Sequence, residues 1–314
     1  MNVAKQGLLG GVLVLSLMLG ACSPPPQLEV APTPIAGKFS YVGEIKGEFG
    51  DEELSLPVAI AFDMSRSAYV IDQGNNRVVK LRPDNTFERE NGGYGLGFNG
   101  LSHPVSMESD GGISFFILDQ GNNRIIRSDY NLVFSDEIRF NSNPDLELAG
   151  KIADIAFSRF GNMYLVDPDN LKVIMLDKDY AREQELFPAG GFAQCTIVTV
   201  GDEGNAYVYD RNLDAIYIFD SFGNAKGSIE LEDAGILGDF IVRTGMIIAT
   251  DKERHEIVVY DMNGERMMAT GSFGSGTLSL NGPTGLAMRS DNLLYVCDTG
   301  NNRIVIYELA APLP

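Results

Sequence analysis

The residues with the clearest chemical potential are an aspartate and an arginine that recur together around a short polar turn. The pair occurs as Asp72 with Arg77, Asp119 with Arg124 and Asp298 with Arg303. Each pair encloses Gln-Gly-Asn-Asn or Thr-Gly-Asn-Asn. The carboxylate can accept amide hydrogens of the turn, and the guanidinium can pair with it. Because the pair returns with each copy of a longer pattern, we interpret it as turn architecture and not as three ligand sites.

Other candidates for catalysis or metal binding are scattered along the chain. The only histidines, His103 and His255, are far apart in the sequence, and we predict no two-histidine site. Asp63, Asp154 and Asp239 lie near expected inner strands and are the candidate ligands of a divalent cation, although their spacing is not a metal motif. No nucleophile with a nearby base, phosphate loop or haem motif is present. We therefore assign no catalytic residue, no metal site and no cofactor.

The repeated aspartate belongs to a longer unit that must position these groups. It recurs about every 45 residues, at Asp72, Asp119, Asp167, Asp210, Asp251 and Asp298. Aromatic or β-branched residues stand three positions before each aspartate and six positions after it, as expected of strands. Each unit holds four expected strands, and the central ones are apolar almost continuously. Four strands in this period are typical of a β-propeller blade.

We therefore predict an all-β, six-bladed β-propeller with four-stranded antiparallel blades. The sixth unit ends at Tyr307 without an outer strand of its own, whereas residues 39–45 form a spare strand. We expect this strand to pair in the last blade and close the ring, which removes an exposed sheet edge. Cys195 and Cys297 then lie in different blades, too far apart for a disulfide, so we expect two free, buried thiols.

The last unit, from Asn281 to Tyr307, resembles the NHL repeat, and the first two units match it through Gln-Gly-Asn-Asn-Arg. The resemblance extends over residues 39–309, but the third, fourth and fifth units depart from it in their turns. It implies a propeller and says little about activity, since NHL-like propellers serve as binding platforms, sensor domains and, less often, enzymes. The NHL-like lyases bind a metal through several histidines, which this sequence lacks. Gluconolactonase-like propellers hold a divalent cation with carboxylates and an asparagine.

The N-terminal segment resembles that of bacterial lipoproteins. A lysine precedes a short apolar run, and Leu-Gly-Ala-Cys ending at Cys22 is similar to a lipobox. The resemblance implies that residues 1–21 are a signal peptide and that Cys22 is lipidated, for example with palmitate. It places the protein in the bacterial cell envelope, at the outer membrane. Residues 22–38 are rich in proline and form a tether, which leaves 39–314 as the propeller.

The charge of the chain limits its partners. The formal net charge is -19. Nucleic acids and anionic membrane surfaces attract basic patches, so neither is an expected partner. We expect a monomer that meets the membrane only through its lipid anchor, with a protein or small ligand of the cell envelope as partner.

The predicted ring places the turns between second and third strands on the same face as the loops that join the blades. We call this the loop face, and we expect it to bind. The candidate binding residues on it are Tyr94, Phe98, Leu101, His103, Asp167, Asp169, Asp210, Asp214 and His255. The leading hypothesis is a non-enzymatic binding or scaffold module. The alternative is a metal-dependent lactonase- or lyase-like enzyme with its site in the central channel, and a sensor domain is a third hypothesis.

Overall fold

The computed structural model describes residues 38–111, 113–143, 146 and 151–310. The chain divides into two compact units, and all of these residues belong to the second, Ile35–Pro314. The predicted signal peptide, Cys22 and the tether up to residue 37 lie outside the described residues. Within the described ranges, no helix has the length and apolar character needed to cross a membrane.

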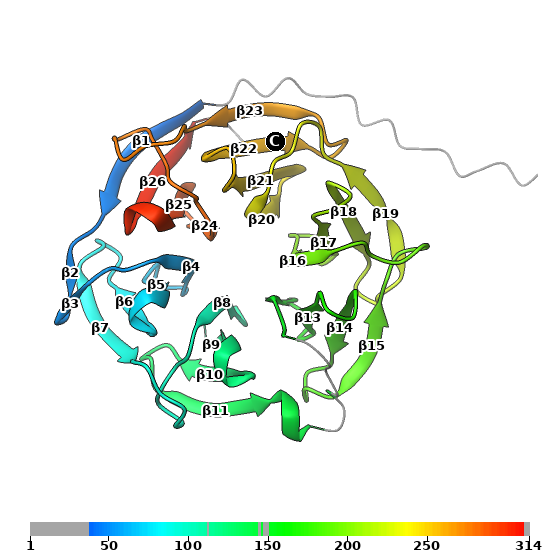
Figure 1. Cartoon of the computed structure of the whole chain (residues 1–314), viewed down its shortest axis with the longest axis horizontal. Coiled ribbons are helices and arrows are strands. Elements are labelled where there is room, and N and C mark those ends of the chain that lie inside the picture. The colour runs from blue at the N-terminus through cyan, green and yellow to red at the C-terminus, as the bar shows by residue number, and fades with distance from the viewer. Residues whose placement is uncertain (1–37, 112, 144–145, 147–150, 311–314) are drawn as a thin grey trace, which may run out of the picture. The chain divides into compact units, whose positions relative to one another are not determined.

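Six four-stranded antiparallel sheets surround a central channel, as predicted (Figure 1). Blade 1 comprises β4 (Pro57–Phe62), β5 (Ala68–Asp72), β6 (Arg77–Leu81) and β7 (Phe87–Gly92). Blade 2 comprises β8 (Pro104–Ser109), β9 (Ser114–Asp119), β10 (Arg124–Asp129) and β11 (Phe134–Arg139). Blade 3 comprises β12 (Asp154–Phe157), β13 (Met163–Asp167), β14 (Lys172–Leu176) and β15 (Arg182–Leu186). Blade 4 comprises β16 (Cys195–Val200), β17 (Ala206–Asp210), β18 (Ala215–Phe219) and β19 (Ala225–Glu230). Blade 5 comprises β20 (Leu237–Arg243), β21 (Met246–Asp251), β22 (Glu256–Asp261) and β23 (Arg266–Thr270).

Blade 6 closes the ring, because its outer strand comes from the opposite end of the described chain. Its order is β1-β26-β25-β24. The four strands are β24 (Leu286–Met288), β25 (Leu293–Asp298), β26 (Arg303–Ala310) and β1 (Lys38–Ile45). β1 pairs antiparallel with β26, and Tyr41 lies opposite Tyr307. The predicted closure by the N-terminal strand is therefore confirmed.

Short elements complete the connections between the strands. A two-stranded hairpin of β2 (Glu48–Phe49) and β3 (Glu52–Glu53) lies between β1 and β4. The 3-10 turns are η1 (Gln73–Asn75), η2 (Gln120–Asn122), η3 (Phe140–Ser142) and η5 (Thr299–Asn301). In η1, η2 and η5 the turn ends at an asparagine in the left-handed region, which asparagine tolerates better than most residues.

The core lies between neighbouring blades, which explains the apolar character of the central strands. Every residue of β5 and β9 is buried. One cluster joins Tyr69 and Ile71 of blade 1 to Phe115 and Ile117 of blade 2. The rings of Tyr69 and Phe115 stack with their centroids 3.9 Å apart. Because both faces of a central strand are covered, alternation of polar and apolar residues is absent there.

The two cysteines of the ring are free and buried, as predicted. Cys195 begins the inner strand β16, and Cys297 lies in β25. Burial raises the pKa of the Cys195 thiol to about 12 and also raises that of Cys297. Both side chains therefore remain protonated thiols that pack as small apolar groups.

Candidate functional site

The repeated aspartate and arginine form a buried, hydrogen-bonded ion pair beneath the loop face, which we call the brace. In blade 2, Asp119 accepts hydrogen bonds from Ser102 N at 2.7 Å and from Arg124 Nε at 2.8 Å. Arg124 Nη2 donates to the carbonyls of Gly97 at 2.9 Å and Gly100 at 2.5 Å. Equivalent bonds are made by Asp72 with Arg77 and by Asp298 with Arg303. The repeated residues fasten each connecting loop to its blade, so their bonds are satisfied within the protein.

The nine candidate binding residues differ in whether they reach the surface. Exposed side chains belong to Tyr94, Phe98, His103, Asp169 and Asp214, and His255 is half-buried. Leu101, Asp167 and Asp210 are fully buried. Asp210 accepts hydrogen bonds from the amides of Ala193 and Gln194, and Asp167 accepts one from Asn170. These three residues are therefore corrected from candidate contact residues to residues that hold the loops.

His255 occupies a position that asparagine fills in other blades. Its Nδ1 accepts a hydrogen bond from Gly282 N at 2.8 Å. Asn76 and Asn302 accept the equivalent amide hydrogen through Oδ1 in blades 1 and 6. All three have positive φ, between 52° and 59°. The His255 ring also contacts Phe273, with centroids 4.8 Å apart. The histidine thus supports the loop between blades 5 and 6.

Two connecting loops of the loop face are built alike and carry exposed apolar side chains. They are residues 93–103 between blades 1 and 2 and residues 272–282 between blades 5 and 6. The backbones of Tyr94 and Leu101 form an isolated parallel β-bridge in the first loop, and those of Phe273 and Leu280 form one in the second. The two leucines are fully buried, whereas Tyr94 is 78% exposed and Phe273 71% exposed. Further exposed side chains of these loops are Leu96, Phe98 and Leu278.

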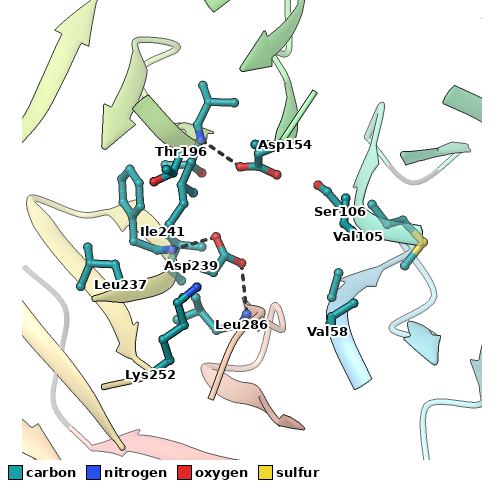
Figure 2. A pocket seen from close by; sticks show the side chains of 18 of the residues that line it. Val58, Val105, Ser106, Asp154, Thr196, Leu237, Asp239, Ile241, Lys252 and Leu286 are labelled. Carbon is teal, nitrogen blue, oxygen red and sulfur yellow. Dashed lines mark hydrogen bonds between the residues drawn. The ribbon is translucent and has the colours of Figure 1, made fainter. Parts of the chain in front are cut away.

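The central channel contains a cavity of about 290 Å³ that the inner strands line. Two of the three predicted carboxylates, Asp154 and Asp239, face it (Figure 2). The third does not, and that prediction is corrected. Asp63 lies in the β4–β5 turn, where Oδ1 accepts from the amides of Ser65 and Ser67. A short polar side chain after a strand bonds its own turn readily, and this competes with an inward orientation.

Sequence reasoning missed a third carboxylate of the channel, Glu108. It lies near the end of β8, two positions after Ser106, and both line the cavity. Because alternate residues of a strand point to the same side, the two-residue spacing from Ser106 could have indicated that Glu108 also faces the channel. A second cavity, of about 300 Å³, also includes Glu108 among its lining residues, and it extends to Arg243 at the end of β20. Glu108 therefore lies between the two ends of the channel.

Each channel aspartate links its inner strand to the next blade. Asp154 Oδ2 accepts from Val198 N of blade 4 at 2.9 Å. Asp239 Oδ2 accepts from Leu286 N of blade 6 at 3.2 Å, and these bonds appear as dashed lines in Figure 2. Burial raises the pKa of both aspartates, and the charge of Asp154 raises that of Asp239 further. Burial and the charges of both aspartates raise the pKa of Glu108 well above its ordinary value. The neutral forms of the three acids are therefore favoured relative to acids in water.

The channel carboxylates do not fit a resident divalent cation. Across the ranges that the structure describes, no three His, Cys, Asp or Glu side chains meet closely enough to hold a metal ion. A hard cation needs several free oxygen ligands around one point. Here oxygens of Asp154 and Asp239 already accept backbone amide hydrogens of neighbouring blades. These hydrogen bonds show that Asp154 and Asp239 join neighbouring blades.

Comparisons with known proteins agree with this architecture. No curated protein sequence matches the chain, but 1068 chains of solved structures do. Virginiamycin B lyase from Staphylococcus aureus is 10% identical, with a TM-score of 0.57 over 87% of this chain and 99% of the lyase chain. A Bacteroides thetaiotaomicron protein of unknown function is 13% identical, with a TM-score of 0.64 over 87% of this chain and 76% of that chain. The Cps50 (Swd1) β-propeller domain of Myceliophteria thermophila is 11% identical, with a TM-score of 0.61 over 86% of this chain and 99% of that domain.

These likenesses show the fold alone, because the three proteins are only 10%, 13% and 11% identical to the chain. The family model of the NHL repeat matches residues 280–307. These residues include β24, β25 and the part of β26 up to Tyr307, with the turn that holds Asp298 and Arg303. The chain is therefore a six-bladed β-propeller that carries an NHL repeat in its last blade.

Proposed function

We propose that this protein is a non-enzymatic binding or scaffold module that holds a protein partner on its loop face. The observation that supports this proposal is the pair of like-built loops with exposed aromatic side chains, Tyr94 and Phe273. Aromatic residues are enriched in protein interfaces relative to the remaining surface. Exposed apolar groups that gather on one face often mark such an interface.

The rigidity of the two loops supports the same proposal. Asn122 Nδ2 donates to Gly95 O at 3.0 Å in the first loop. Asn301 Nδ2 donates to Gly274 O at 2.8 Å in the second. The arginine of each brace donates to further carbonyls of the same loop. A loop that is already ordered loses little conformational entropy on binding, so its aromatic side chains contribute more to affinity.

Site-specific photo-crosslinking in the producing cells tests the proposal. A benzophenone amino acid replaces Tyr94 or Phe273, and a third variant carries it in place of Phe222. Phe222 is 76% exposed in the turn between β18 and β19, on the opposite face of the ring, and is the matched control. We expect the two loop positions to crosslink to the same protein and the control position to give no such product. Equal crosslinking from Phe222, or none from either loop, would contradict the proposal.

The purified partner then permits a quantitative test. Tyr94→Ser and Phe273→Ser should each weaken its binding by about ten-fold or more, as expected of aromatic anchors. Both side chains are exposed, so the midpoint of thermal unfolding should change little. Unchanged affinity in both variants would remove the two loops from the interface.

The second candidate function is a metal-dependent lactonase- or lyase-like reaction in the channel. The observation that favours it is the presence of Glu108, Asp154 and Asp239 around one cavity. The bonds of the two aspartates to backbone amides argue against it. Calorimetric titration with Ca²⁺ and Mg²⁺ separates the candidates. One-to-one binding that Asp239→Asn abolishes would favour the enzyme, and absence of such binding would favour the module.

We also propose that the protein is exported and anchored in the cell envelope through a lipid on Cys22. The resemblance of the segment around Cys22 to a lipobox supports this proposal. The mass of the N-terminal peptide from isolated membranes should show a chain that begins with acylated Cys22. Cys22→Ser should abolish acylation and release the protein from the membrane fraction. A mature chain that begins at another residue would contradict the proposal.

A further inference from the structure

In three blades, the residue that follows the repeated aspartate lies beside the start of the next blade's inner strand. In blades 1, 2 and 6 its side chain is neutral and donates a hydrogen bond to a carbonyl of the next blade. These residues and their acceptors are Gln73 with Pro104, Gln120 with Ile152 and Thr299 with Pro57. The position therefore lies beside the inner strands that form the channel wall.

In blades 4 and 5 this position is occupied by cations, Arg211 and Lys252. The backbone is equivalent, because Arg211 N donates to Gln194 O and Lys252 N to Ile236 O, as Gln73 N does to Leu56 O in blade 1. Both cations line the channel cavity, and Figure 2 labels Lys252 among its lining side chains. Two adjacent blades thus place positive charge at one side of the channel mouth.

Neither of these cations forms an ion pair with a residue that the structure describes, although acids line the same cavity. Neither side chain takes part in any of the hydrogen bonds found among the described residues, although the chain has a net charge of -19. Both side chains reach solvent, and partial desolvation at the channel mouth lowers the pKa of Lys252, as does the charge of Arg211. The two groups are therefore close enough to repel each other, and a bound anion would relieve that repulsion.

We propose that Arg211 and Lys252 form a binding site for the carboxylate or phosphate group of a small organic anion at the loop-face mouth of the channel. The planar fork of an arginine binds such oxyanions through two parallel hydrogen bonds, and the lysine ammonium adds a third donor. The cavity of about 290 Å³ beneath the cations accommodates the rest of a small molecule. This site is separate from the aromatic loops and does not depend on the proposed protein partner.

The deeper wall of the cavity is compatible with an anion. Thr196 offers a hydroxyl group there, and three acids of the inner strands, Glu108, Asp154 and Asp239, also line the cavity. Because burial raises the pKa of all three acids, their negative charge is reduced relative to free carboxylates at the same pH. In its neutral form an aspartic acid can donate a hydrogen bond to the ligand.

Titration calorimetry of the full-length protein with succinate and with inorganic phosphate, at constant ionic strength, tests this site. Arg211→Gln and Lys252→Gln introduce the residue that blades 1 and 2 carry at the same position, so both variants should fold. The matched control is Arg243→Gln, which removes the same charge at the other end of the channel. We expect one-to-one binding of at least one probe, weakened by about ten-fold in each of the first two variants and unchanged in the control.

Competitive labelling gives a second readout that does not depend on the variants. With trace acetic anhydride near neutral pH, Lys252 should react faster than Lys178, a surface lysine whose pKa its partner Asp179 raises. The bound probe should protect Lys252 and leave Lys178 unaffected. Protection by succinate alone identifies a carboxylate site, and protection by phosphate alone identifies a phosphate site. Absence of both saturable binding and protection with either probe would overturn the proposal, as would equal weakening by Arg243→Gln.

Discussion

Arg124 shows at the residue scale how a charged side chain becomes part of the framework. It is among the largest fully buried side chains, and Asp119 Oδ2 lies 2.8 Å from its Nε. Arg124→Met would leave Asp119 buried without its counter-charge and would remove the guanidinium donor from two loop carbonyls, of which Gly97 O keeps the amide hydrogen of Gly100. We expect the free energy of unfolding to fall by about 3–5 kcal/mol, measured by urea denaturation.

Arg89→Met provides the matched comparison for Arg124→Met. Arg89 pairs with Glu88, but its side chain is 47% exposed. Exposed pairs contribute little, so this variant should lose no more than about 1 kcal/mol. Similar losses in the two variants would show that the buried brace has no special role in stability.

Glu108 gives a prediction about pH. Its folded pKa is raised by burial and by the charges of Asp154 and Asp239, so ionisation in the channel opposes folding. Its contribution to stability is complete below the unfolded pKa and is lost as the pH rises through the folded value. Glu108→Gln should therefore unfold at a higher temperature than the natural protein at pH 8, with a smaller difference near pH 5. Calorimetric scans across this range measure the effect.

The control for Glu108→Gln is Glu230→Gln, which changes an exposed glutamate. It should leave the pH dependence of the unfolding temperature as it is in the natural protein. If Glu108→Gln also left that dependence unchanged, Glu108 would titrate as it does in water, and the channel would be more polar than its lining indicates.

Residue roles were predictable from the sequence only where a pattern repeats. Asp119 and Arg124 stood out because other blades carry the same pair. Glu108 is unlike its counterparts in the other blades, and Lys252 shares its positive charge only with Arg211 of blade 4, so no pattern repeated through the ring indicated them. Leu101 was mistaken for a contact residue because a loop leucine appears exposed in a linear sequence. Its burial depends on folding of the loop back onto its blade, which only the three-dimensional structure shows.

At the scale of elements, β1 determines whether the ring is closed. Ile45 is 6% exposed and packs in a cluster with residues of blades 1 and 6, including Leu54 and Ile304. Ile45→Asp would bury a charge at this junction and release β1, which would expose the edge of β26. We expect a large loss of stability in urea denaturation and the appearance of aggregates in size-exclusion chromatography.

Val42 provides the control within the same strand. It is 51% exposed at a register shift between β1 and β26, so Val42→Asp should change stability by less than about 1 kcal/mol. Equal stability of the two variants would mean that β1 is not needed to close the ring.

The strands themselves were predictable because their physical requirements are local. Central strands must be apolar on both sides, and outer strands are more polar, so these runs and their regular spacing were enough to predict four strands per unit. The closing strand was recognised because the last unit lacked an outer strand. The orientation of Asp63 was not predictable, since a residue at the end of a strand can face the channel or its own turn. Only packing decides between these two orientations.

At the scale of the whole molecule, the six blades share the four-stranded framework but differ in the side chains that they place on the loop face and in the channel. Blades 1, 2 and 6 carry the complete brace, and blades 4 and 5 carry cations at the channel mouth. The repeated pattern therefore predicts the architecture, whereas the differences between blades suggest where ligands bind. A propeller without an open edge should also unfold as one cooperative unit, because each blade shares its core with two neighbours.

The two thiols of the ring test this cooperativity directly. Cys195 lies in blade 4 and Cys297 in blade 6, and both are buried with raised pKa values, so neither should react with iodoacetamide in the folded protein. In increasing urea, we expect both to become alkylated at the same denaturant concentration, as measured peptide by peptide in a mass spectrometer. Labelling of one cysteine at a clearly lower concentration would show that blades open separately, because local opening exposes only the core around that thiol. If β1 closes a single cooperative ring, Ile45→Asp should lower the urea concentration of half-maximal alkylation equally for both cysteines. A lower value for Cys297 alone would show that the substitution destabilises only blade 6.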